Sequence, residues 1–183
     1  KIREAKLADA EPIAVVVVET GVSTYTGIMP QDYLESRTVE ERTRVWRGRL
    51  SDPTRLRPRW FVLVAEDPSG KVVGFAGGGP ESGYGLPFSG ELGFIYVLPP
   101  YQRKGAGRTL VADLVERLLE QGHNSMLVWV LEANPFRVFY EALGGQQVAL
   151  RMVRFGNASL SEVAYGWADL KALSGLLKAR PTV

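Results

Sequence analysis

The chain has no cysteine and a single histidine, His123, among its 183 residues. Without cysteine there can be no disulfide, no cysteine-ligated zinc and no covalent cysteinyl intermediate. One histidine argues against a histidine-rich metal site and against a serine–histidine triad. Since His123 follows Gln121-Gly122 at a predicted helix end, we interpret it as a surface residue there. We therefore expect no bound metal.

Long apolar runs are also missing. The longest early run, Ile13 to Val18, is much shorter than the roughly 20 residues that a transmembrane helix needs. No signal peptide is recognisable. We expect a cytoplasmic protein without a membrane partner.

The charge of the chain is nearly balanced. Its formal net charge is +2, with 45% hydrophobic and 23% charged residues, as in ordinary soluble domains. This charge is too small to suggest a general nucleic-acid-binding protein. Arginines nevertheless cluster in one segment, where acidic residues lie among them: Arg42, Arg44, Arg47, Arg49, Arg55, Arg57 and Arg59. We favour a solvated helix face followed by a basic connector, and the alternative is contact with an anionic substrate or a cofactor phosphate.

Periodicity and turn residues predict the element order β-α-α-β-β-β-α-β-α-β-β. Strands are expected over residues 2–5, 60–66, 71–77, 91–98, 125–131, 146–155 and 161–167. Helices are expected from residue 9 past residue 17, from 30 to about 50 with a break near Arg37-Thr38, and over 107–121 and 134–143. Many strands and hairpins favour an α/β protein of the α+β type, with a mixed, mostly antiparallel sheet of about seven strands. We expect one domain over residues 1–169 and a partly helical tail over 170–183.

The most informative segment is Tyr96 to Gly107, which joins a predicted strand to an amphipathic helix. Gly105 and Gly107 allow the backbone to approach a ligand closely. The following helix directs its free N–H groups and positive dipole end at the loop. Further donors and positive charge come from Gln102, Arg103, Lys104 and Arg108. The segment therefore predicts an anion site, most simply for a pyrophosphate.

Two common phosphate motifs do not fit this loop. A Walker A motif would place Lys-Ser/Thr after the glycine, whereas Arg108-Thr109 follows Gly107. A dinucleotide fingerprint would need a small residue where Leu110 stands. The pattern that remains for the expected anion site is Gln/Arg-x-x-Gly-x-Gly/Ala.

The stretch Gln102-Arg103-Lys104-Gly105-Ala106-Gly107 resembles the acetyl-CoA-binding loop of the GNAT acyltransferase superfamily. Phe139-Tyr140-Glu141-Ala142-Leu143-Gly144 resembles the Phe-Tyr-Glu-x-Leu-Gly helix of the same family, and the element order is similar over residues 2–169. This resemblance implies the GNAT fold, in which strand four carries a bulge and splays away from strand five. It also implies acetyl-CoA as cosubstrate, with its pantetheine arm in the gap.

The resemblance further implies which residues contact acetyl-CoA. Backbone groups of Ile95 and Val97 would pair with the pantetheine, and a main-chain N–H would polarise the thioester carbonyl. Asn134 is the default helix N-cap and is assigned to the arm only by analogy, because it lies six rather than seven residues before Tyr140. The implied set is Ile95, Tyr96, Val97, Gln102, Arg103, Lys104, Gly105, Ala106, Gly107, Arg108, Thr109, Asn134 and Tyr140.

Two residues are candidates for proton transfer. Glu91 matches the position of a general-base glutamate in several family members, and strict alternation would place Glu91, Gly93, Ile95 and Val97 on one face. An apolar neighbourhood would raise its pKa, although an exposed ion pair at the strand start is the simpler alternative. Tyr140, with an ordinary pKa near 10, would protonate the departing thiolate or hold the sulfur. Its alternative role is aromatic packing on the sheet.

The function expected from these residues is N-acetyl transfer from acetyl-CoA to a primary amine of a small molecule, by direct attack in a ternary complex. The alternatives are a silent acyl-CoA-binding or sensory module and an acetyltransferase acting on protein N-termini or lysines. The acceptor would lie against residues 21–33 and 77–90, with Tyr25, Tyr33, Tyr84 and Glu91 around it. No nucleic-acid partner is expected, and a homodimer is left open.

Overall fold

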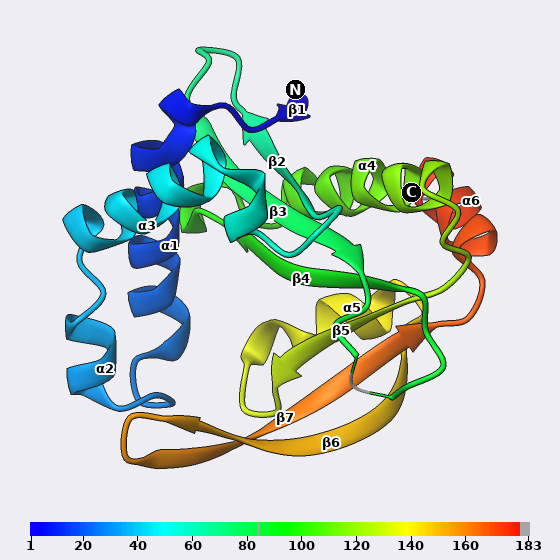
Figure 1. Cartoon of the computed structure of the whole chain (residues 1–183). Coiled ribbons are helices and arrows are strands. Elements are labelled where there is room, and N and C mark those ends of the chain that lie inside the picture. Colours follow the sequence, from blue (N-terminus) through cyan, green and yellow to red (C-terminus); the bar gives the residue numbers. More distant parts are fainter. Residues whose placement is uncertain (84, 180–183) are drawn as a thin grey trace.

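The computed structural model of the chain describes residues 1–83 and 85–179. Its centre is a seven-stranded sheet with the strand order β1-β2-β3-β4-β5-β7-β6 (Figure 1). The strands are β1 (Ile2–Glu4), β2 (Phe61–Glu66), β3 (Val72–Pro80), β4 (Gly90–Val97), β5 (Met126–Leu131), β6 (Gln146–Phe155) and β7 (Ala158–Trp167). All neighbouring strands pair antiparallel except β4 and β5, which are parallel. The predicted mixed, mostly antiparallel sheet is confirmed.

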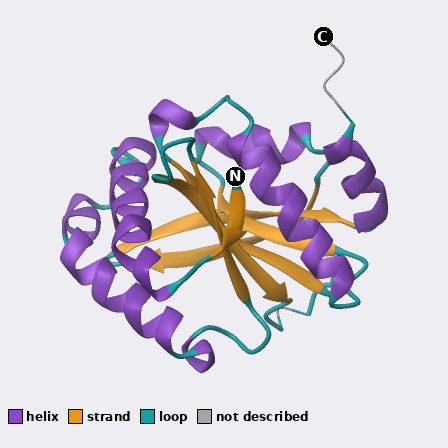
Figure 2. Cartoon of the chain, turned by 90° about the horizontal axis from the view of Figure 1, so that it is seen from above, coloured by secondary structure: helices purple, strands orange, loops and turns teal. Residues whose placement is uncertain are grey.

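Helices cover both faces of this sheet (Figure 2). They are α1 (Ala10–Tyr25), α2 (Gln31–Glu35), α3 (Val39–Ser51), α4 (Ala106–Glu120), α5 (Val138–Ala142) and α6 (Leu170–Lys178). Helices α1 and α3 lie on one side of the sheet, and α4 and α6 on the other. No helix in the described part of the chain is long and apolar enough to cross a membrane.

The core follows from the apolar stripes of these helices. In α4, residues at helical spacing are all fully buried against the sheet: Leu110, Val111, Leu114, Val115 and Leu118. In α1, the corresponding stripe is Ile13, Val16 and Val17. Each fully buried side chain of this kind contributes about 1.5–3 kcal/mol, so the two stripes fix the helices to opposite faces of the sheet.

The segment after residue 169, predicted to be a partly helical tail, contains α6. Asp169 caps this helix, since its Oδ1 accepts from the N–H groups of Lys171 and Ala172 at 2.9 and 3.0 Å. Leu170, Leu173 and Leu177 are buried in the same core as α4. Residues 170–178 are thus packed on the domain.

β4 and β5 separate soon after they meet. They pair only at Gly90 with Met126 and at Glu91 with Leu127. Beyond these pairs the two strands diverge (Figure 1). The predicted splay between strands four and five is confirmed, and among the described residues it leaves one edge of β4 from Leu92 onward without a partner strand.

β4 also carries a bulge. Gly78 of β3 pairs with Leu92 and Gly77 with Phe94, so Gly93 is an extra residue. Only glycine fits there, because a Cβ on Gly93 would lie 2.2 Å from the ring of Trp60. An extra residue moves all later side chains to the other face of the strand.

The predicted alternation of β4 is therefore wrong. Ile95 faces α4, with its Cδ1 4.0 Å from the position of a Cβ on Gly107. Phe94 faces α3, where its ring lies 5.5 Å from that of Trp46. Glu91 lies on the same side of β4 as Phe94, where its carboxylate contacts Arg57 and Arg57 lies over the ring of Trp60. Glu91 and Ile95 therefore lie on opposite faces of β4.

The early helices differ slightly from prediction. α1 was predicted to run past residue 17, and it continues to Tyr25. The break expected near Arg37-Thr38 is confirmed, because α2 ends at Glu35 and α3 begins at Val39. The longer α1 brings Tyr25 to the open end of the splay.

Candidate functional site

The loop between β4 and α4 has a tightly defined backbone. Gln102 Nε2 donates to the carbonyl oxygen of Val97 at 2.8 Å, which ties the loop to the end of β4. Arg103 and Gly105 both have positive φ, 59° and 89°. Gly105 is the N-cap of α4, a position where a left-handed backbone favours glycine. The loop therefore turns sharply and presents its amide groups outward.

The amides of this loop are free. Within residues 1–83 and 85–179, no carbonyl or side chain accepts a hydrogen bond from the N–H groups of residues 103–108. The first partnered amide is that of Thr109, which donates to Gly105 O at 2.9 Å. Consecutive free N–H groups at a helix N-terminus form an anion site, strengthened by the helix dipole.

The side chains around the loop contribute unequally. Arg103 and Lys104 are exposed, and Lys104 Nζ lies 6.0 Å from the ring centre of Tyr101. Arg108 Nη2 donates instead to carbonyls at the end of α6, Leu176 O and, at 3.2 Å, Ala179 O. Thr109 Oγ1 donates back to Gly105 O at 3.1 Å. The guanidinium of Arg108 thus holds the end of α6, and the free backbone amides are the main hydrogen-bond donors of the loop.

A cavity of about 620 Å³ adjoins the loop at the splay. Three groups of residues line it, from α1, from β4 with its loop, and from the segment around α5: Thr20, Thr24, Tyr25, Ile95, Tyr96, Val97, Gln102, Arg103, Gly105, Gly107, Arg108, Asn134, Phe136, Val138, Phe139, Tyr140, Ala142 and Leu143. The volume is in the range of ordinary ligand sites. The predicted residues around the loop are thereby brought together, although Lys104, Ala106 and Thr109 do not line the cavity.

Tyr140 lies in the wall of this cavity. It is 8% exposed, and its ring packs 6.0 Å from Tyr165 and 6.5 Å from Trp167. Its hydroxyl makes no hydrogen bond to any residue that the structure describes. Burial raises the pKa of Tyr140, and the nearby Tyr96 raises it further, so the expectation of an ordinary pKa is wrong. The phenol remains protonated throughout the physiological range.

Glu91 lies at the narrow end of the splay, in the last β4–β5 pair. It is 5% exposed, and its Oε2 accepts from Ser82 Oγ and, at 3.2 Å, from Arg57 Nη1. Arg57 in turn lies 4.9 Å from the ring centre of Trp60. Burial raises the pKa of Glu91, while Ser82 and Arg57 oppose this and leave a net increase. The carboxylate does not line the cavity and approaches the splay from the α3 side of β4.

Comparison with known proteins accounts for this arrangement. The model of the acetyltransferase (GNAT) family matches residues 24–144. The uncharacterized N-acetyltransferase YuaI of Bacillus subtilis is 42% identical over 96% of this chain and 97% of its own. The chain belongs to the GNAT family. It is accordingly an N-acetyltransferase.

More distant relatives of this GNAT protein include a Pseudomonas aeruginosa L-methionine sulfoximine/L-methionine sulfone acetyltransferase. It is 27% identical over 76% of this chain and 84% of its own. Among solved structures, the PaiA N-acetyltransferase of Thermoplasma acidophilum, in complex with coenzyme A, has a TM-score of 0.63 and 19% identity. That similarity covers 89% of this chain and 96% of PaiA and shows the shared GNAT fold.

Asn134 has a structural role in this GNAT protein. Its Oδ1 accepts from the N–H of Phe136 at 2.8 Å, which is the expected N-cap. Its Nδ2 donates to the hydroxyl of Tyr25 at 3.1 Å. The amide therefore holds the end of α1 against the segment that leads to Tyr140, on the wall of the cavity.

The three tyrosines predicted around the acceptor have different positions. Tyr25 lines the cavity, and burial raises its pKa. Tyr33, on α2, packs its ring 5.4 Å from Phe155 of β6 and does not line the cavity. Tyr84 lies outside the described residues.

Some cavity residues were not predicted. Thr20 and Thr24 precede Tyr25 on α1, and Phe136, Val138 and Phe139 surround the start of α5. For the residues of α1, the sequence did contain a signal: Val17, Thr20 and Thr24 follow one another at helical spacing along one face. The residues around α5 gave none, since their apolar side chains resemble core residues.

Proposed function

We propose that this GNAT protein transfers the acetyl group of acetyl-CoA to a primary amine of a small molecule, by direct attack within a ternary complex. The observation that carries the proposal is the run of free amides at residues 103–108, beside a cavity in the splay of the sheet. The loop suits a pyrophosphate, and the cavity suits an extended acyl-pantetheine arm.

The free edge of β4 supports the position of that arm. From Leu92 onward this edge has no partner in β5, so its backbone groups can pair with an extended ligand as a strand would. Ile95 and Val97 line the cavity at this edge. A main-chain N–H there would stabilise the negative charge that develops on the thioester oxygen.

Two proton transfers complete the reaction. The ammonium group of the acceptor must lose a proton before its nitrogen attacks, and we assign this proton to Glu91, directly or through one water molecule. The raised pKa of Glu91 suits a base that works near neutral pH. As the new carbon–nitrogen bond forms, the carbon–sulfur bond breaks and the sulfur leaves as a thiolate; the proton that the nitrogen must still lose balances the one that the sulfur gains.

Tyr140 is the group assigned to this thiolate. Its phenol is protonated and has no competing partner among the described side chains. Because burial raises its pKa, the buried phenol is a weaker acid than a phenol in water. It therefore first donates a hydrogen bond to the thiolate. Full proton transfer follows only when the sulfur is itself desolvated. The proton finally appears on the thiol of CoA.

A small acceptor agrees with the relatives. The Pseudomonas relative is named for small amino-acid analogues. The competing candidates are a silent acyl-CoA-binding module and a protein acetyltransferase. The presence of Glu91 and Tyr140 argues against the silent module, and the substrates named for the Pseudomonas relative favour a small acceptor.

The test combines calorimetry with turnover. We expect the purified protein to bind acetyl-CoA saturably and to release free thiol only when an amine from a small-molecule panel is present. Binding without turnover on any amine or peptide would identify a silent module instead. Turnover restricted to peptide N-termini or lysines would identify a protein acetyltransferase.

A further inference from the structure

The two oxygens of the Glu91 carboxylate have different surroundings. Oε2 accepts from Ser82 Oγ and, at 3.2 Å, from Arg57 Nη1. Nothing among the described residues donates to Oε1, and Oε1 is not one of the side-chain atoms that are fully buried there without a partner. One oxygen is therefore anchored, and the other is open to a further hydrogen-bond donor.

The first anchor, Arg57, is held by an aromatic ring. Arg57 and Trp60 lie in the connector between α3 and β2, where the N–H of Trp60 donates to the carbonyl oxygen of Arg57 at 3.0 Å. This turn brings the guanidinium of Arg57 over the indole ring, 4.9 Å from its centre. The side chain of Arg57 stays 48% exposed, whereas that of Glu91 is buried. The ring thus fixes the direction from which Arg57 reaches the buried carboxylate.

Trp60 is in turn wedged between β3 and β4. Glycines on both strands make room for its ring, because a Cβ would lie 2.4 Å from the ring at Gly79 and 2.2 Å from it at Gly93. Its Nε1 donates to the carbonyl oxygen of Pro80 at 3.0 Å. Gly93 is the bulge residue, two positions after Glu91. The ring that occupies the space at the bulge therefore also supports the anchor of Glu91.

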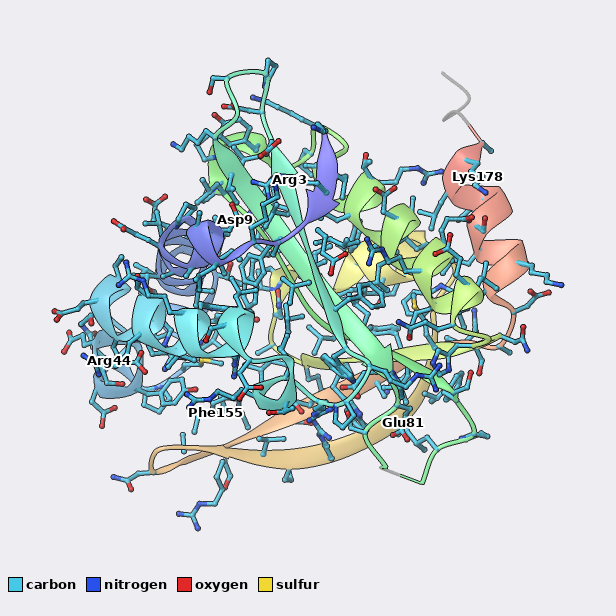
Figure 3. All side chains as sticks on the ribbon, turned by 45° about the horizontal axis from the view of Figure 1, so that its top comes forward. Arg3, Asp9, Arg44, Glu81, Phe155 and Lys178 are labelled. Atoms are coloured by element: carbon cyan, nitrogen blue, oxygen red, sulfur yellow. The ribbon has the colours of Figure 1, made fainter. Side chains whose placement is uncertain are left out.

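The second anchor, Ser82, comes from a different segment. It lies in the loop between β3 and β4, two residues beyond Pro80, and Figure 3 shows its neighbour Glu81 near the end of β3. Ser82 and Arg57 thus converge on one oxygen of Glu91 from two separate segments. The carboxylate could exchange its two oxygens only by rotating about its last side-chain bond, which would break both contacts.

The charges around Glu91 indicate what each anchor does. Burial raises the pKa of Glu91, and the contacts with Ser82 and Arg57 oppose this increase. Glu81 of the loop raises the pKa further, and Arg151 of β6 lowers it. In the described part of the chain, Arg57 is the cation within ion-pair distance of the carboxylate. Removal of either anchor should therefore favour the protonated form of Glu91.

We propose that Ser82 and Arg57 are positioning residues, which hold Oε2 of Glu91 so that Oε1 takes the proton of the acceptor amine. This inference rests on the proposed acetyl transfer, in which Glu91 is the base. The proton passes from the ammonium nitrogen to Oε1, directly or through one water molecule, and the freed electron pair of the nitrogen attacks the thioester carbon. A carboxylate held in one orientation needs no rearrangement before this step.

The experiment removes each anchor and compares it with a similar contact elsewhere. The test variants are Ser82→Ala and Arg57→Gln, and Arg57→Lys keeps the charge if the glutamine variant is unstable. Ser69→Ala is the first control, since it deletes a hydroxyl that donates to a carboxylate at 2.6 Å in the β2–β3 turn. Arg55→Gln is the second control, because Arg55 is an exposed arginine of the same connector as Arg57.

Two readouts separate positioning from mere structural support. The first is kcat, with KM for acetyl-CoA, measured across pH at a saturating concentration of an accepted amine. The second is the ionisation of Glu91 itself, followed by NMR of its carboxyl carbon, whose signal is assigned by its loss in Glu91→Gln. Melting temperatures establish that each variant is folded.

We expect kcat of Ser82→Ala and Arg57→Gln to fall by about tenfold, less than the loss of the base itself should cost. The acid limb of kcat and the NMR midpoint of Glu91 should both move to higher pH. KM for acetyl-CoA should remain close to that of wild type, Arg57→Lys should recover part of the loss, and both controls should behave as wild type.

An unmoved acid limb and an unmoved NMR midpoint in both test variants would overturn the inference while the proposed transfer stands. A lower melting temperature with neither shift would have the same meaning, because Ser82 and Arg57 would then only support the fold. Failure of the wild type to acetylate any amine would overturn both proposals.

Discussion

The proposed acetyl-CoA side and the proposed acceptor side of this GNAT protein differ in which groups form them. The first consists largely of backbone: free amides at residues 103–108 and the unpaired edge of β4. The second, as proposed, consists of side chains: Glu91 with its partners Ser82 and Arg57, and Tyr25 in the wall of the cavity. A backbone site needs only a particular chain geometry, whereas a side-chain site depends on which residues the tertiary structure brings together.

This difference determines how each side should respond to substitution. The acetyl-CoA side should be sensitive to changes of backbone conformation and tolerant of changes in charged side chains. The acceptor side should show the opposite behaviour. Glu91 and Tyr140 are the residues assigned to proton transfer, so their loss should have the largest effects.

Replacement of Tyr140 by phenylalanine should have the largest effect. The ring and its packing are kept, while the only donor assigned to the thiolate is lost, and we expect kcat to fall by about 10². Acetyl-CoA affinity and the melting temperature should change little. Tyr165→Phe is the control, since Tyr165 stacks on Tyr140 but donates to Glu141 at 2.5 Å. Equal turnover of Tyr140→Phe and wild type would make Tyr140 a packing residue only.

Glu91→Gln should reduce turnover by a comparable factor of about 10² at low pH and by less at high pH, where the amine is already neutral. Because the folded-state pKa of Glu91 is raised, ionising it costs stability as pH rises above its unfolded-state value. The variant should therefore gain thermal stability near pH 7 relative to wild type, and this gain should vanish at acidic pH. Rate profiles and melting curves across pH measure both.

A lower melting temperature of Glu91→Gln than of wild type near pH 7 would contradict this prediction. It would mean that the contact of Glu91 with Arg57 stabilises the fold on balance. Glu91 would then be a structural ion-pair residue rather than a base.

Gly105→Ala tests the backbone side. Gly105 has φ of 89°, and no atom lies within 4 Å of where an alanine methyl group would be, so strain rather than collision is expected. A left-handed alanine costs about 1–2 kcal/mol, and reshaping the loop should weaken acetyl-CoA binding by about tenfold. Gly122→Ala, at the far end of α4 with φ of 87°, has the same strain and should not alter binding. Calorimetry on both variants decides whether the loop geometry matters.

The smallest effect is expected from Arg108→Gln. Its bonds to Leu176 O and Ala179 O hold the end of α6, so unfolding free energy should fall by about 1 kcal/mol. Acetyl-CoA affinity should remain close to that of wild type in the same titration. A large loss of affinity would show that this side chain, and not only the backbone, binds the phosphates.

The same difference explains which parts of the fold and of the site could be predicted from the sequence. The order of strands and helices followed from periodicity and turns, and Gly105 with its neighbours indicated the anion loop. The bulge was expected from the family resemblance, but its position at Gly93 depends on Trp60, which packs where a Cβ would be. Simple alternation therefore placed Glu91 on the wrong face relative to Ile95.

Other site features depend on contacts between distant segments. Arg108 was expected at the phosphates because it follows the loop, yet α6 offers it carbonyls from 68 and 71 residues further along. The arginine cluster could not be divided into exposed and half-buried side chains without the orientation of α3. Backbone motifs are local and readable, whereas side-chain sites are assembled by the fold.

Direct transfer in a ternary complex is the central claim, and rapid-quench mass spectrometry tests it most directly. The protein is mixed with acetyl-CoA alone and then with acetyl-CoA and an accepted amine, and the masses of protein and amine are followed through the first turnover. We predict that acetylated amine and free CoA form together while the protein never gains an acetyl group. A protein that becomes acetylated without the amine, and then passes that acetyl group to it, would contradict the account.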